Sequence, residues 1–493
     1  MRMWICLHLR YLPLEALRPS WSEPGRYVLM EQDQVLIATK EARSAGVRLA
    51  MRRSGVAAVA PDAVMLDRDL HKEDSALNTI AMALLRFTPE VTYADDFCVL
   101  LDVTASLNLF RGPLSICRHI KQCVRMLGFT ATMGTAPTAM GACLLSRAPI
   151  GKKYSQLRRT VQSKTMERRL NRLPVLLLPH APAYFEWLQG IGCDSIGQLR
   201  KLPRAGLQRR THQSLLDAMD KAFGMAPELF EWIKTPLSFS ARMETHDRIE
   251  HAEALLFGAE RLLLQLVGWL VSLQKAVSRF VLYLEHERGR TAVAPTSLEI
   301  ALAEPAWHEE HLIRLIRERL GRLELTAPVI ALRLEVLQLL EMLPPTDSLF
   351  PEPGGSPEDH NRLLELLVAR LGKDNVLILA PVPDHRPELA NCWISVTASN
   401  TSKASKHNID TTDLERPFWL LENPIQLMMR DDRPFYNSTL KIIKGPERIE
   451  SGWFDDAMAA RDYYIAQASD STCYWIYLER SADPRWFLHG LFA

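Results

Sequence analysis

Apolar and polar residues follow two periods along the first 150 residues. The apolar run Trp4–Leu9 predicts a buried strand, and Val35–Thr39 and Phe97–Val103 predict two more. Asp74–Phe87 has apolar residues at helical spacing and opens with an Asp-Ser pair that favours a helix cap. Strands that alternate with helices indicate an α/β or α+β unit in this part of the chain.

A second α+β pattern covers residues 241–340. A leucine-rich helix is followed by strands and a further helix, in the order helix–strand–strand–helix–strand, with one more strand expected before them. This order fits a duplicated β-α-β plan. The predicted helices are Ala252–Val277 and His308–Leu323, and the predicted strands are Phe239–Met243, Arg279–His286, Leu298–Leu302 and Val329–Leu337.

The remaining segments predict linkers, short helices and a small β-rich module. Lys152–Arg172 is basic and compatible with helix, and short helices broken by Pro and Gly follow it. Leu343–Pro357 is a Pro/Gly-rich linker, Asn361–Leu371 an amphipathic helix, and Thr397–Thr412 a polar segment expected to be mobile. The last eighty residues are aromatic and strand-like, with Trp453, Tyr464 and Trp475 expected in the core of the module.

Charge is distributed in blocks. The chain has 59 Lys+Arg and 58 Asp+Glu, a net charge of +1. Residues 103–210 hold 18 Lys+Arg and 3 Asp+Glu, so this block carries +15 and the other residues −14. A block of one sign usually faces a partner, and a basic block favours nucleic acid, although a solvated surface is the alternative.

The cysteines and the apolar runs limit the class of protein. The eight cysteines are scattered, with no C-x-x-C pair and no zinc-ligand spacing, which indicates reduced thiols and predicts neither a metal site nor a cofactor. The N-terminus lacks a signal-peptide pattern, and the apolar run Leu262–Leu273 is too short to span a bilayer. We therefore expect a cytoplasmic protein without a membrane segment.

Five stretches together resemble the Y-family DNA polymerases, and within them the ImuB branch of polymerase-like proteins. EARSAGVRLAM resembles the fingers motif, LLDVTASLNLFRG a palm strand, and GCDSIGQLRKLPRAGLQRR a helix-hairpin-helix thumb. GPERIESGWF followed by RDYYIA, and the ending WFLHGLFA, resemble the C-terminal region of that branch. The resemblance implies an α+β, multidomain fold with palm, fingers, thumb and little finger.

The resemblance also implies domain boundaries. The palm would cover residues 1–165 with the fingers inserted at about 20–75, the thumb 166–235 and the little-finger-like domain 236–342. The linker would cover 343–360 and the C-terminal partner-binding region 361–493, with 397–412 as its mobile segment.

A polymerase of this family needs carboxylates that hold magnesium, and this chain lacks them where the family places them. The first family motif corresponds to the stretch around Cys6, Leu7 and His8, and the second puts Phe97 and Cys98 where an Asp-Glu pair belongs. Ala139 replaces the palm lysine, whereas Arg43 keeps the type that contacts phosphate. The resemblance thus implies an inactive site, because phosphoryl transfer depends on these charges.

An active but diverged translesion polymerase stays open as an alternative. It would use Asp95, Asp96 and Asp102. Asp95 and Asp96 lie two residues upstream of the expected pair, which displaces a side chain by roughly 6–7 Å along a strand. That displacement is large against metal–ligand distances of about 2 Å.

The candidate binding residues form three sets. The basic thumb would contact the phosphate backbone of primer–template DNA, the linker peptide resembles a sliding-clamp-binding peptide, and the C-terminal region would bind ImuA and the error-prone C-family polymerase ImuC. The alternatives are a Leu-Phe pair packed on its own neighbour, a local salt-bridge network at the C-terminal residues, and a protein-interaction scaffold without DNA binding. The DNA set is Lys152, Lys153, Gly192, Ser195, Gly197, Arg200, Lys201, Arg204, Arg209 and Arg210; the clamp set is Thr346, Asp347, Ser348, Leu349 and Phe350; the partner set is Glu447, Arg448, Glu450 and Arg461.

Overall fold

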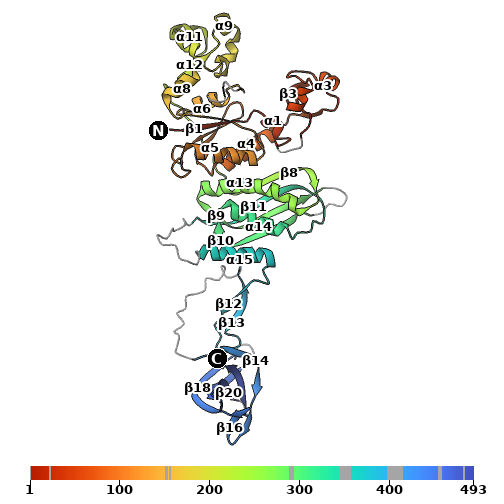
Figure 1. Cartoon of the computed structure of the whole chain (residues 1–493), viewed down its shortest axis with the longest axis vertical. Coiled ribbons are helices and arrows are strands. Elements are labelled where there is room, and N and C mark those ends of the chain that lie inside the picture. Colours follow the sequence, from red (N-terminus) through yellow and green to blue (C-terminus); the bar gives the residue numbers. More distant parts are fainter. Residues whose placement is uncertain are drawn as a thin grey trace. The chain divides into compact units, whose positions relative to one another are not determined.

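The structure is a computed structural model that divides into two compact units, Met1–Glu358 and Asp359–Ala493. It describes residues 2–20, 24–149, 151, 154, 157–287, 294–342, 357–396, 415–453, 458–480 and 483–492. The clamp-like peptide Thr346–Phe350, the polar segment 397–412, and Lys152 and Lys153 lie outside the described residues. Within the described residues the chain has mixed helices and sheets in several sub-structures (Figure 1).

The first unit is built around an antiparallel sheet with the strand order β5-β6-β1-β7. One face of β1 carries Cys6 and packs under helix α6, whereas Ile5 and Leu7 are fully buried on the other face. The predicted strands at Trp4–Leu9 and Phe97–Val103 are confirmed within two residues. The bounds are β1 Trp4–His8, β5 Val91–Ala94, β6 Cys98–Asp102, β7 Thr132–Ala136, α1 Leu12–Glu15, α4 Leu70–Leu84, α5 Pro113–Met126 and α6 Ala139–Ser146.

Helix α4 begins earlier than the sequence pattern predicted. The expected cap was the pair at Asp74, but the side chain of Asp69 accepts a hydrogen bond from the backbone N–H of Lys72 at 3.2 Å. That bond satisfies one of the free N–H groups of the first turn, so the helix starts at Leu70.

A small sheet with the order β3-β2-β4 is inserted after β1, and a series of short helices follows the first sheet. The insert has its own apolar core, which includes Val28, Val35 and Val56. The later helices share one core with α6 and with the face of β1 that carries Cys6. The bounds are β2 Tyr27–Glu31, β3 Gln34–Ala38, α2 Lys40–Ser44, α3 Arg53–Val59, β4 Val64–Asp67, α8 Ser163–Leu170, α9 Phe185–Gly190, α10 Ile196–Lys201, α11 Arg204–Arg210 and α12 Gln213–Phe223.

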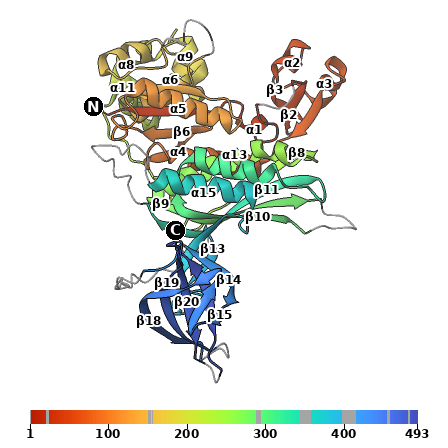
Figure 2. The ribbon, with the colours of Figure 1, turned by 60° about the horizontal axis from the view of Figure 1, so that its bottom comes forward.

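The second sheet has the order β10-β9-β11-β8, and the leucine-rich helix α13 lies over it (Figure 2). The predicted elements are present, but α13 ends at Leu273 rather than Val277. Gln274 adopts a left-handed conformation with φ of 53°, and Ala276 and Val277 pair with β11 instead. The bounds are β8 Ser240–Ile249, α13 Leu256–Leu273, β9 Lys275–His286, β10 Thr296–Ala306, α14 Glu309–Leu320 and β11 Val329–Glu341.

The stretch Ala252–Leu273 is long and apolar enough to cross a membrane, yet 72% of its apolar 18-residue window is buried inside the protein. Helix α13 packs on its sheet, on α14 and on α4. At Gly268 a Cβ atom would lie 2.0 Å from the carbonyl oxygen of Met82, so the crossing of α13 and α4 requires glycine. Its hydrophobic surface is therefore explained by burial on several sides.

The second unit is rich in β-structure. Its main sheet has the order β14-β21-β20-β19-β18, and Trp475 and Tyr463 are buried in its core. Trp453 was expected in that core, but it is 80% exposed because it follows the end of β18. The bounds are α15 Pro357–Leu371, β12 Leu377–Pro381, β13 Asn391–Ser395, β14 Trp419–Gln426, β15 Met428–Arg430, β16 Arg433–Tyr436, β17 Ser438–Thr439, β18 Lys441–Ser451, β19 Ala459–Gln467, β20 Cys473–Glu479 and β21 Trp486–Leu491.

Candidate functional site

The strand pair β1–β6 fixes the residues at the predicted degenerate catalytic positions. His8 lies directly opposite Cys98, and Cys6 lies opposite Leu100. Alternate residues of a strand share a face, so Cys6, His8 and Cys98 all project toward α6. On this face the side chains of Cys6, His8 and Cys98 are sulfur and imidazole groups, and the carboxylate of Asp102 lies at the far end of β6.

Asp95 and Asp96 lie outside the strand, in the turn that joins β5 to β6. Asp96 and Phe97 have positive φ values of 61° and 52°, as a tight turn requires. The Asp96 carboxylate is 3.5 Å from Nε2 of His8 and 3.4 Å from Nε of Arg147. The Arg147 guanidinium thus holds it at the edge of the sheet, beside the His8 imidazole, whose pKa is lowered by burial. Arg147 also donates a hydrogen bond to the carbonyl oxygen of Asp95.

Asp102 lies at the opposite end of β6, where it pairs with Trp4. It is four positions beyond Cys98, which corresponds to about 13 Å along a strand. Its carboxylate accepts hydrogen bonds from the backbone N–H of Thr104, at 3.0 Å, and from the Thr104 hydroxyl. Asp102 therefore stabilises the turn after β6 and cannot share one metal ion with Asp96.

Three cysteines converge beneath α6. The Sγ atoms of Cys6, Cys98 and Cys143 all lie within 4.8 Å of one another, and each residue is buried. Burial raises the pKa of the Cys6 thiol well above its ordinary value, whereas hydrogen bonds with the Cys143 and Cys6 thiols lower the pKa of Cys98. Among the described residues, the three potential metal ligands that lie this close together are Cys6, Cys98 and Cys143.

Sequence reasoning missed this cluster because the three cysteines are far apart in the chain. Metal-site patterns depend on ligands at short, regular spacing, and these cysteines have none. The resemblance drew attention to Cys6 and Cys98, but only as positions that had lost a carboxylate. Cys143 comes from α6, and nothing in the sequence places it against β1.

The N-terminus of α6 is occupied by a side chain of the same unit. The Glu228 carboxylate accepts hydrogen bonds from the backbone N–H groups of Ala139 and Met140, at 2.9 Å and 2.8 Å. Thr138 caps the helix by accepting a bond from the N–H of Gly141. Burial raises the pKa of Glu228. Ala139, which stands where the resemblance places a lysine, is therefore beside an acid of the chain itself.

Arg43 lies on the exposed surface of α2 in the inserted sub-structure. Its guanidinium donates a hydrogen bond to the Tyr11 hydroxyl at 3.4 Å. Thr39 caps the helix and Ala42 anchors it in the small core, so the fold presents Arg43 to solvent. Its predicted contact with phosphate stays a prediction.

The predicted DNA-binding cations differ in their surroundings. Arg200 is paired with Glu167, and Arg204 with Asp220. The other described cations of the predicted set are exposed and form no ion pair with a described residue: Lys201 on α10, and Arg209 and Arg210 on α11.

The hairpin before α10 uses its own backbone N–H groups. Gly192 has a φ of +66°, which the tight turn requires. Ser195 caps α10 through a capping box with Gln198, and the N–H of Gly197 bonds to the carbonyl oxygen of Asn171. Since these N–H groups are engaged inside the unit, DNA contacts here would have to come from side chains.

The four predicted partner-binding residues all form ion pairs within the second unit. Such a network is the alternative that the sequence left open, and it leaves the predicted role untested. The pairs are Arg416–Glu447, Arg448–Asp462, Arg480–Glu450 and Arg461–Glu388.

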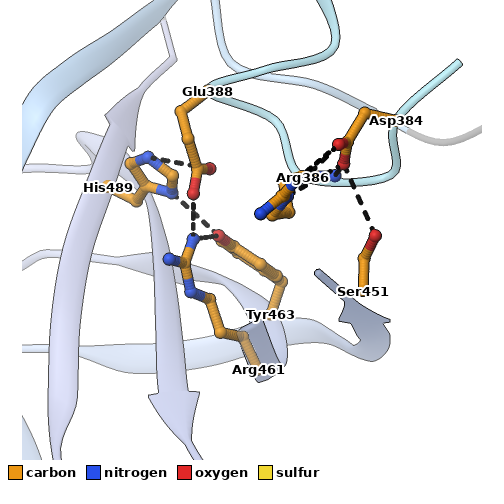
Figure 3. Close-up of polar contacts among 7 residues, drawn as sticks. All are labelled: Asp384, Arg386, Glu388, Ser451, Arg461, Tyr463 and His489. Atoms are coloured by element: carbon orange, nitrogen blue, oxygen red, sulfur yellow. Dashed lines mark hydrogen bonds and ion pairs between the residues drawn. The ribbon is translucent and has the colours of Figure 1, made fainter. Parts of the chain in front are cut away.

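Arg461 belongs to a polar cluster that attaches the loop after β12 to the main sheet (Figure 3). Its guanidinium lies 2.9 Å from Oε1 of Glu388 and donates a hydrogen bond to the Tyr463 hydroxyl at 3.1 Å. The same hydroxyl contacts Nδ1 of His489 at 2.8 Å. Burial lowers the pKa of His489 to about 4, so this imidazole is neutral at pH 7.

Comparisons with known proteins agree with the resemblance. The impB/mucB/samB family model matches residues 17–147. Protein ImuB of Caulobacter vibrioides strain NA1000 / CB15N is 24% identical over 467 residues, which cover 88% of this chain and 97% of that protein. Protein ImuB of the strain ATCC 19089 / CIP 103742 / CB 15 matches with the same values.

Solved structures of the Dbh DNA polymerase are also similar. The insertion ternary complex is 16% identical with a TM-score of 0.39, covering 69% of this chain and 99% of that chain. The post-insertion binary complex is 17% identical with a TM-score of 0.39 and the same coverage.

Proposed function

We propose that this chain, which is ImuB-like over most of its length, is a non-catalytic adaptor in translesion synthesis and damage-induced mutagenesis. It would bind primer–template DNA and the sliding clamp, and it would recruit ImuA and the error-prone C-family polymerase ImuC. The activity of the complex would then belong to the recruited polymerase, and the cytoplasm would be its place of action.

The observation that carries this proposal is the separation of the nearest carboxylates. Asp96 is in a turn with His8 and Arg147, and Asp102 is engaged by Thr104 at the other end of β6. Two-metal phosphoryl transfer needs carboxylates that converge on ions about 3.5–4 Å apart. The described residues of this sheet do not supply such a pair.

Primer extension tests the loss of catalysis. The purified chain, supplied with magnesium and all four nucleotides, should not extend a primer. Extension that disappears in the Asp95→Ala, Asp96→Ala double variant, and survives in Asp69→Ala, would contradict the proposal and support an active polymerase. Asp69 is a suitable control because it caps α4, away from the β1–β6 pair.

DNA binding would depend on the unpaired cations of α10 and α11. Each cation that contacts a phosphate releases a counterion, and contributes about 0.9 to the slope of log affinity against log salt. A Lys201, Arg209 and Arg210 triple Ala variant should therefore lose about 2–3 units of slope. The matched control replaces three cations of α14, Arg314, Arg317 and Arg319, and should keep the slope. Equal slopes in the two variants would support a scaffold that does not hold DNA there.

Clamp binding would use Leu349 and Phe350 in the linker. A competing peptide, Gln338–Leu340, belongs to β11 and pairs with β9, so it is not available as an extended ligand. The Leu349→Ala, Phe350→Ala double variant should lose clamp affinity by about 100-fold, which equals roughly 3 kcal/mol. Leu340→Ala should retain it. Unchanged affinity in the double variant would refute the assignment.

Recruitment of ImuA and the C-family polymerase would use charged groups on the main sheet of the second unit. Glu450, which pairs with Arg480, offers a single-residue test. Glu450→Lys should weaken capture of one of the two partners. Asp483→Lys, which disrupts the comparable exposed pair with Arg485, should leave capture unchanged. If both variants capture both partners normally, this surface is not the docking site.

A further inference from the structure

Three thiols from separate elements meet at one point in the first unit. Cys6 and Cys98 are diagonal neighbours on the β1–β6 pair, and Cys143 reaches them from α6. The Sγ atoms of Cys6 and Cys143 are 3.4 Å apart, and all three Sγ atoms lie within 4.8 Å of one another. The cysteines are free thiols.

These separations are close to those of sulfur atoms that share a metal ion. A metal–sulfur bond of about 2.3 Å in trigonal or tetrahedral geometry places the sulfur atoms about 3.8–4.0 Å apart. The Cys6–Cys143 separation of 3.4 Å is below that value, and the limit of 4.8 Å on the other two is within about 1 Å of it. Adjustments of less than about 1 Å in side chains that already face one another would therefore form the site.

The surroundings of the thiols suit a negatively charged metal–thiolate group. The Arg147 guanidinium lies beside the Cys98 sulfur, its side chain is only 13% exposed, and its Nε is 3.4 Å from the Asp96 carboxylate. The Ser146 hydroxyl lies 3.3 Å from the Cys6 sulfur. His8, directly opposite Cys98, and the exposed Asp96 carboxylate lie at the edge of the sheet nearest the cluster.

We propose that Cys6, Cys98 and Cys143 bind one soft, thiophilic cation, Cu(I) or Zn(II), through three thiolate sulfurs. Binding would form three metal–sulfur bonds and release the thiol protons to solvent, with no change in oxidation state. Thiolates select such ions over magnesium, which prefers oxygen ligands. Arg147 would offset the net negative charge of the group. The spacing of the cysteines in the sequence predicts no metal site, so the proposal departs from that expectation.

The alternative is that the three thiols pack in the core without a ligand. A metal-binding experiment on the full-length chain distinguishes the two. In the chain used for this test, Cys392 and Cys473 are changed to Ser, which removes the half-buried thiols of the second unit. This chain is reduced, stripped of metal, and offered Cu(I) or Zn(II) in competition with a chelator. Native mass spectrometry counts the bound ions. One ion per chain is expected with at least one of the two metals.

The matched variants are Cys98→Ala and Cys117→Ala, because both remove a buried cysteine of the first unit and Cys117 lies on α5. Cys98→Ala should weaken binding by about 100-fold or more, and Cys117→Ala by less than about threefold. Arg147→Gln should weaken binding by about 10-fold. Thermal melting without metal verifies that each variant folds.

Three results would overturn the proposal. The first is that the chain retains neither ion. The second is that Cys98→Ala, folded by its melting curve, retains the ion as well as the parent. The third is that the stripped chain forms a Cys6–Cys143 disulfide under mild oxidation, while its reduced form binds no ion. None of these results bears on DNA binding or primer extension, so the metal site and the proposed function fail independently.

Discussion

Replacing Glu228 should release the start of helix α6, which covers the sheet face with the cysteine cluster. Its carboxylate accepts hydrogen bonds from two backbone N–H groups, at 2.9 Å and 2.8 Å. A hydrogen bond to a charged group contributes about 1.5–3 kcal/mol net, and the two share one carboxylate. We therefore expect Glu228→Ala to cost about 2–4 kcal/mol locally, and Glu228→Gln, which keeps one acceptor oxygen, about half of that.

Hydrogen exchange of the α6 amides measures this cost without assuming that the whole chain unfolds in one step. A loss of 2–4 kcal/mol corresponds to about 30- to 1000-fold faster exchange wherever those amides exchange through opening of the helix. Glu231→Ala is the control, because Glu231 lies in the same segment and is exposed. Exchange in Glu228→Ala within about threefold of the parent would refute the reasoning.

The pH dependence of the same variants has a definite sign. Burial raises the pKa of Glu228 above its ordinary value, so the folded chain holds this proton more tightly than the unfolded chain. The parent's free energy of unfolding, relative to Glu228→Gln, should thus be greatest below the unfolded pKa and fall as pH rises through the folded pKa. Urea denaturation at pH 4 and pH 7 measures the difference, and an advantage that grows with pH would contradict the raised pKa.

Two further predictions concern buried polar groups of each unit. Asp102→Ala should lower the free energy of unfolding by about 1–3 kcal/mol, because it removes the hydrogen bonds to Thr104. The control Asp95→Ala, at an exposed position, should change it by less than about 0.5 kcal/mol. Urea denaturation measures both variants, and equal effects would refute a structural role for Asp102. Burial holds the pKa of His489 at about 4. The parent should therefore lose up to roughly 3 kcal/mol of stability relative to His489→Gln as pH falls from about 6.5 to about 4. A difference in the free energy of unfolding that stays constant across that range, measured by urea denaturation, would refute the lowered pKa.

The local elements were largely predictable because they depend on short-range pattern. Alternating and apolar runs located the strands β1, β6 and β9 and the helices α4, α13 and α14 within a few residues. The errors fell where a tertiary contact outweighs the pattern. Helix α13 ends early because Ala276 and Val277 pair with β11, and Trp453 is exposed because the chain leaves the sheet before it.

The candidate site was predictable only in part. The resemblance identified Cys6, His8 and Cys98 as residues that lack a carboxylate oxygen where the family places its metal ligands. The register of β1 and β6 brings these three residues to one face. The same register separates Asp96 from Asp102, which sequence reasoning could treat only as a distance along an assumed strand. The roles predicted for the DNA, clamp and partner residues stay predictions, since they depend on molecules outside the chain.

The sequence by itself determined the α+β pattern, the basic block and the residue types at the ends of the central strands, because each is a property of neighbouring positions. The tertiary structure decided which charges are available and which side chains meet. It paired Arg200 and Arg204 with acids and left Lys201, Arg209 and Arg210 exposed. It also brought Cys143 against Cys6 and Cys98, since hydrogen bonding between strands and the packing of α6 act over separations that no local pattern encodes.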